Sequence, residues 1–95
     1  MSDNTLYGSV VEKIISEQEQ IIGPIALEQA ASIPGLKIDW PNHAVAFDGD
    51  APEIVNQLIT RYSNFFGPAA VEVCKDATRD IVSRMGAQQV PSLLR

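Results

Sequence analysis

Cysteine is almost missing from this chain of 95 residues: Cys74 is the only one, so no disulfide can form within the chain. A lone cysteine fits a reducing compartment better than a secreted one. The first residues show no basic, apolar leader, and no apolar run approaches the roughly 20 residues that cross a bilayer. We therefore expect a cytoplasmic protein.

Basic residues are also few. Seven Lys and Arg stand against 12 Asp and Glu, which gives a formal net charge of −5, and the basic residues are scattered along the chain. Phosphate backbones are bound by clustered Lys and Arg, and anionic membrane surfaces attract polybasic segments. The composition therefore argues against a nucleic-acid partner and against a membrane partner.

Residues that carry chemistry are scarce as well. His43 is the only histidine, and it follows Pro41-Asn42 in a predicted turn with no Cys or His nearby. Acid–base catalysis needs two positioned groups, and a metal site needs several ligands. Cys74 lies on an apolar helical stripe, where a free thiol is typically buried and inert. We expect no enzyme activity and no metal or cofactor.

Two acidic patterns have a functional and a structural interpretation. Asp48-Gly49-Asp50 is similar to part of a calcium loop, but position 59 is Ile, where the closing Glu would stand. Asp50 with Glu53 has the spacing of a capping box, which we favour. Glu28 and Glu72 are candidates for paired carboxylates, as in the metal sites of helical bundles, but the chain has no Glu-x-x-His motif. The helix dipole favours a Glu in the first turn of a helix, which explains both positions.

Apolar residues, 45% of the chain, are present in ordinary amount and are well patterned. Their spacing of three and four predicts helices over 5–22, 24–32, 51–66 and 68–85, with breaks at Gly23-Pro24 and Gly67-Pro68 and a cap at Gly86. Alternation over 36–40 and 44–48 predicts a two-stranded hairpin. We expect one domain over 1–95, in which the tail 87–95 is either mobile or docked.

An internal repeat is the most informative feature. Residues 21–28, Ile-Ile-Gly-Pro-Ile-Ala-Leu-Glu, match residues 65–72, Phe-Phe-Gly-Pro-Ala-Ala-Val-Glu, at an offset of 44 residues. The preceding apolar stripes keep this offset, with Val10, Val11, Ile14 and Ile15 matching Ile54, Val55, Leu58 and Ile59. The sequence predicts a predominantly helical α+β fold: four helices in two helix–Gly-Pro–helix units, with the hairpin inserted between them.

The segment Ile22-Gly23-Pro24-Ile25-Ala26 resembles the I-G-P-I-A segment of small helical domains appended to some bacterial protein kinases and response regulators. This resemblance implies a signalling-associated interaction domain with no catalytic residue to carry over. A core this thin is often completed across a dimer interface. We therefore expect a non-catalytic interaction or regulatory module that forms a homodimer and docks on a larger signalling protein.

The aromatic residues are the candidate site. A hairpin face around Trp40 and Phe47 is one candidate partner surface, because Trp is enriched in binding hot spots. The alternative function is a small-molecule sensor with an apolar pocket between the two helical units. The candidate interaction or pocket residues are Trp40, Phe47, Tyr62, Phe65 and Phe66.

Overall fold

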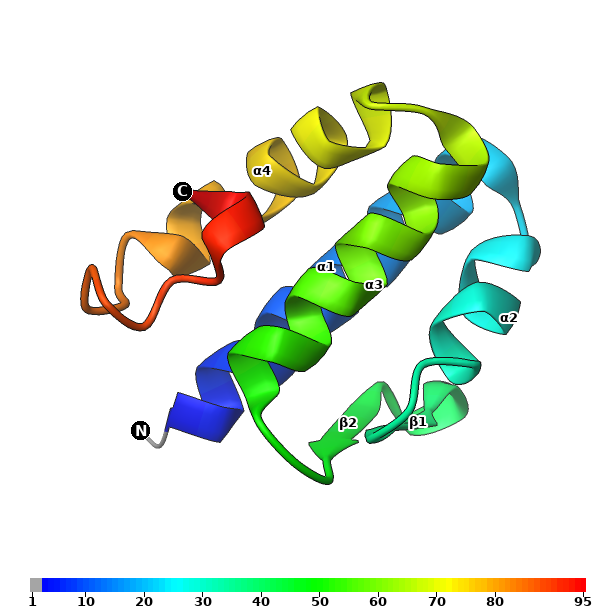
Figure 1. The fold of residues 1–95 in the computed structure, drawn as a ribbon. Helices are drawn as coiled ribbons and strands as arrows, with labels where there is room; N and C mark the ends of the chain where they lie inside the picture. Colours follow the sequence, from blue (N-terminus) through cyan, green and yellow to red (C-terminus); the bar gives the residue numbers. More distant parts are fainter. Residues whose placement is uncertain (1–2) are drawn as a thin grey trace.

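The structure is a computed structural model that describes residues 3–95, with side chains from Thr5 onward. It confirms the predicted fold class, with two helical units and an inserted hairpin (Figure 1). The elements in chain order are α1 (Asp3–Ile22), α2 (Ile25–Ala31), β1 (Leu36–Asp39), β2 (Ala44–Phe47), α3 (Ala51–Phe66) and α4 (Ala69–Val82). None of the described helices is both long enough and apolar enough to span a membrane.

The core lies between α1 and α3, which run side by side in the same direction (Figure 1). The two matched apolar stripes of the sequence face each other here, and all eight of their residues are buried. The second helix of each unit packs across the other unit, so that α4 contacts α1 and α2 contacts α3. Burial of these stripes is the main force that holds the two units together.

The hairpin is antiparallel, with Leu36 opposite Phe47 and Asp39 opposite Ala44. Both strands are one residue shorter than the sequence predicted: β1 ends at Asp39 because a 3₁₀ turn begins at Trp40, and β2 ends at Phe47, before the bend at Asp48-Gly49. Pro41 fixes its own φ and offers no N–H for strand pairing. His43 closes the turn with a left-handed φ of 52°.

The predicted end of α4 was wrong. Helix α4 ends at Val82 rather than near Met85, and Gly86 is not its cap. The Ser83 hydroxyl donates to the Asp80 carbonyl at 2.6 Å, and such local bonds compete with helix propagation. The next backbone bonds span three residues, which is the tightening typical of a helix end.

At the start of α3, Asp50 occupies the N-cap position, as the sequence predicted. The predicted capping box is nevertheless wrong, because the Asp50 side chain makes no capping hydrogen bond. Pro52, in the first turn, supplies a φ suited to a helix start and brings no N–H that needs a partner.

The tail is docked. A 3₁₀ helix over Ser92–Leu94 packs on α3 and α4, and Val90 and Leu94 are buried. The Leu93 N–H donates to Asn56 Oδ1 at 3.1 Å, and Asn56 Nδ2 donates to the Ser92 hydroxyl at 3.1 Å. Both hydrogen-bonding groups of the Asn56 amide therefore fix the tail to α3.

Candidate functional site

The two Gly-Pro steps have the same local geometry. Gly23 and Gly67 have φ of 78° and 90°, a region that non-glycine residues rarely adopt. Each glycine N–H donates to the carbonyl four residues earlier, at 2.8 and 2.9 Å. Each glycine carbonyl accepts from the N–H three residues later, at 3.0 and 3.1 Å. At each step, therefore, one helix ends directly before the glycine and the next helix begins two residues after it.

Two long-range hydrogen bonds connect the units beside these steps. The Tyr62 hydroxyl donates to the Ala26 carbonyl at 2.6 Å, and Gln18 Nε2 donates to the Ala70 carbonyl at 3.3 Å. Gln18 and Tyr62 are 44 residues apart, as are Ala26 and Ala70. The first helix of each unit thus holds the second helix of the other unit through a side chain at the equivalent position.

The groups in this network are unreactive. Burial raises the pKa of the Cys74 thiol to about 11, while a hydrogen bond from Gln18 at 3.6 Å acts in the opposite direction. Burial also raises the pKa of Tyr62 above its ordinary value, and the nearby Cys74 and Glu19 contribute to the increase. A thiol that stays protonated in a closed core is a poor nucleophile.

Four large apolar side chains remain exposed where the two steps meet solvent. Ile21 is 61% exposed and Phe65 is 60% exposed, at equivalent positions in the last turns of α1 and α3. Ile25 is 38% exposed and Phe66 is 37% exposed. We call these four residues the apolar end.

By their spacing, all four of these residues continue the apolar patterns of their helices, yet in the structure they are exposed. The helices α1 and α3 end at Ile22 and Phe66, and the chain then turns at glycine. A Cβ built on Gly23 or on Gly67 would have no neighbouring atom within 4 Å, so both turns lie in open space. Side chains in these last turns therefore lie at the margin of the core, where little chain remains to cover them.

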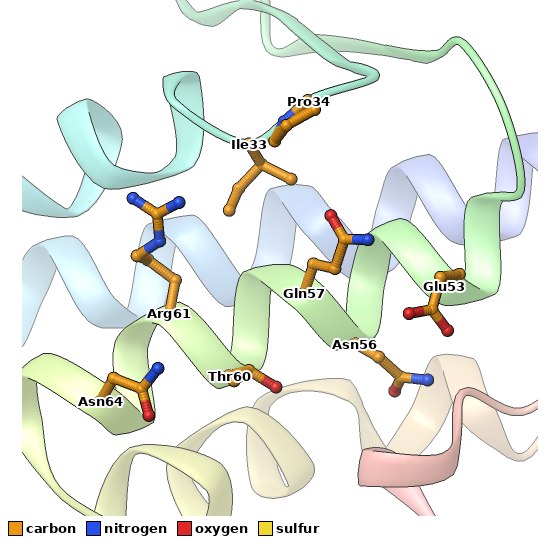
Figure 2. Close-up of a pocket in the computed structure, with 8 residues that line it drawn as sticks. All are labelled: Ile33, Pro34, Glu53, Asn56, Gln57, Thr60, Arg61 and Asn64. Carbon is orange, nitrogen blue, oxygen red and sulfur yellow. The ribbon is translucent and has the colours of Figure 1, made fainter.

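A polar groove of about 410 Å³ runs along the outer face of α3 (Figure 2). The α2–β1 connection borders it through Ile33 and Pro34, and Arg61 Nη1 donates to the Ser32 hydroxyl at 2.9 Å. Most of its lining is the solvent face of one amphipathic helix: Glu53, Asn56, Gln57, Thr60, Arg61 and Asn64.

A second groove, of about 350 Å³, lies between α1 and α4. Its residues Ser9, Glu12 and Lys13 are 44 residues before Glu53, Asn56 and Gln57 of the first groove. The two grooves thus follow from the shared layout of the units. Their linings differ, with amides prominent in the first and charges in the second. Nothing in this correspondence points to a common ligand.

The aromatic residues selected from the sequence lie in three places. Tyr62 is fully buried in the core, Phe65 and Phe66 lie at the apolar end, and Trp40 and Phe47 are half-buried on the hairpin and its turn. None of them lines either of the two grooves. No pattern in the sequence predicted the Gln18 contact, because a glutamine within the polar stretch 16–20 is expected on a solvent-exposed helix face.

His43 does have a partner. Its Nδ1 lies 3.1 Å from Glu12 Oε1, and its ring stacks on Trp40 with centroids 4.5 Å apart. The pair joins the hairpin turn to α1 at the surface. Within the described part of the chain, no three His, Cys, Asp or Glu side chains gather as metal ligands would. Glu28 and Glu72 are both exposed, in the first turns of α2 and α4.

Comparisons with protein-family models, with curated proteins and with solved structures found no significant match.

Proposed function

We propose that this chain is a non-catalytic protein-interaction or regulatory module that acts in the cytoplasm of a bacterium and associates with itself. In this proposal the folded domain carries a docking surface and no reaction centre. The aromatic and aliphatic side chains of the apolar end supply the energy of association, and the rest of the domain positions them.

The apolar end is the observation that carries the proposal. Large apolar side chains exposed together on a small domain typically mark an interaction surface. Here they share one end, because α1 and α3 run in the same direction and finish at equivalent glycines. Hydrogen bonds from Tyr62 and Gln18 hold the helices directly beneath this end. The surface is therefore preorganised, which lowers the entropic cost of binding.

The chemistry of the titratable groups supports a binding role. Cys74 and Tyr62 are buried with raised pKa values, so neither supplies a nucleophile or a base near neutral pH. The net charge of −5 disfavours a polyanionic partner. The resemblance of the Ile22–Ala26 segment to kinase-linked and regulator-linked domains is the reason to place the module in bacterial signalling, docked on a larger protein.

Light scattering of the purified chain, over concentrations from about 1 µM to about 300 µM, tests the proposal at the affinities expected of a small interface. We expect the average mass to rise from that of one chain toward that of two. A mass that stays at one chain over the whole range would contradict self-association. Docking on a larger protein would then have to rest on a separate pull-down experiment.

A further inference from the structure

We propose that the apolar end is the homodimer interface, and that it binds the apolar end of a second copy in a twofold, end-to-end arrangement. This inference rests on the proposed function and specifies how the two copies meet. Ile21, Ile25, Phe65 and Phe66 form its centre in each copy.

The local layout of the two units fits a twofold partner. Ile21 and Phe65 occupy equivalent positions on parallel helices, each two residues before a glycine of left-handed φ. The apolar end of one chain therefore contains the same feature twice, an exposed apolar residue before a glycine turn, once in each helical unit. A twofold interface requires a surface that is complementary to itself, and apolar side chains meet this requirement without paired charges.

The exposed area fits a weak dimer. With roughly 200 Å² for each large side chain, the exposed fractions of the four residues amount to about 400 Å² per copy. A standard interface takes about 800 Å² from each partner, and weaker complexes take less. The exposed Pro24, Pro68 and Ala69 lie beside the centre and extend the apolar area. We expect a dimer that dissociates in the micromolar range.

Charge favours this surface over the others. Two copies at −5 each repel one another, so the interface forms with least cost where no acidic side chain is buried. All four central residues of the apolar end are uncharged, and the first acidic residues of the helices that begin there, Glu28 and Glu72, are exposed, whereas both grooves have acidic side chains in their lining. Added salt screens the overall repulsion, so association strengthens as salt increases, which is the reverse of an interface built on ion pairs.

Sedimentation equilibrium on the whole chain tests the assignment. We expect Phe65→Ser to raise the dimer Kd by about 100-fold, because the ring is lost from both copies of a twofold interface. Ile21→Ser should raise the Kd in the same direction. Both side chains are more than half exposed, so each variant should keep the circular dichroism spectrum and melting temperature of the parent.

Two control variants make the outcome specific. Thr60→Ala changes the polar face of α3, and Ala44→Glu places a charge on the exposed hairpin edge; both should leave the Kd unchanged. A dimer that survives Phe65→Ser and Ile21→Ser would overturn the surface but keep the proposed self-association. A dimer lost only with Ala44→Glu would move the interface to the hairpin. A wild-type chain that stays monomeric would overturn both proposals.

Discussion

The two units share their Gly-Pro step but continue differently beyond it. In the first unit α2 has only 7 residues and gives way to the hairpin, whereas in the second unit α4 continues for 14 residues. At an offset of 44 residues, Pro34 and Gly35 correspond to Thr78 and Arg79. Proline removes a helical N–H and glycine favours a turn, while threonine and arginine both allow the helix to continue.

Gly35 shows why the first unit cannot continue as a helix. Its φ is 83°, and a Cβ there would lie 2.6 Å from the Asp48 carbonyl oxygen. The Asp48 N–H donates to the Gly35 carbonyl at 2.7 Å, which closes the base of the hairpin. One common step therefore leads to two architectures, and the two residues about ten positions further on decide between them.

The largest expected effect comes from the buried stripes and tests whether the two units contribute equally to the stability of the core. Ile14→Ala and Leu58→Ala each remove a fully buried side chain at equivalent positions. Each should lower the free energy of unfolding by about 3–4 kcal/mol, from lost burial plus a cavity. Urea denaturation measures both. A difference of more than about 2 kcal/mol between them would show that one unit dominates the core.

The second prediction concerns the glycines. Gly35→Ala combines a strained φ with a backbone clash and should cost about 3 kcal/mol. In Gly23→Ala and Gly67→Ala the new Cβ would have no atom within 4 Å, so only the positive φ is unfavourable. Each should lower the free energy of unfolding by about 1 kcal/mol. Thermal unfolding of the three variants under one condition gives the comparison. Equal losses at all three positions would mean that the contact with Asp48 relaxes freely.

The third prediction uses pH. The folded-state pKa of Cys74 is raised from 9.0 to about 11, so the unfolded chain loses this proton first and stability falls between these values as pH rises. The loss should be on the order of 2 kcal/mol. Tyr62, also raised, adds to the fall above pH 10. Melting curves from pH 8 to about pH 10.5 measure the slope.

Cys74→Ala is the matched variant for that measurement, because the equivalent position in the first unit is Ala30, which is also fully buried. The variant should flatten the decline most between pH 9 and pH 10, where the thiol contributes more than Tyr62. A slope that is identical in parent and variant would assign the decline to other groups.

The smallest expected effect separates the two connecting hydrogen bonds. Tyr62→Phe leaves the Ala26 carbonyl without its short 2.6 Å donor in the core and should cost about 1–2 kcal/mol. Gln18→Leu removes longer contacts of 3.3 and 3.6 Å and should cost less than about 1 kcal/mol. Denaturant unfolding of both variants ranks the bonds. If Gln18→Leu cost more than Tyr62→Phe, the strength of these hydrogen bonds would not follow their donor–acceptor distances.

Local signals sufficed for most of the fold. Helical spacing and the two Gly-Pro steps predicted four helices in order, and the predicted bounds of α3 were the observed ones. Turn chemistry at Pro41-Asn42-His43 predicted the hairpin. The end of α4 escaped prediction because it depends on the Ser83 hydroxyl, whose choice between solvent and the backbone is not visible in the sequence.

The candidate site was predicted less well, because it depends on where packing stops. Ile21 and Phe65 continue the spacing of their stripes, so periodicity alone assigns them to the core. Their exposure follows from the lack of chain beyond the turn at each glycine. Tyr62, on the same stripe as Phe65 but one turn earlier, is fully buried. Only the three-dimensional arrangement distinguishes these positions.

The hydrogen bond from the Tyr7 hydroxyl to the Gln89 carbonyl, at 2.6 Å, spans 82 positions of the sequence. It fastens the first turns of α1 to the segment that leads into the docked tail, away from the Gly-Pro steps (Figure 1). Opening of the first turns of α1 and release of the docked tail should therefore be coupled. Amide hydrogens near Val10 and near Leu94 should exchange with solvent as a single cooperative unit, separate from the helices held by Tyr62.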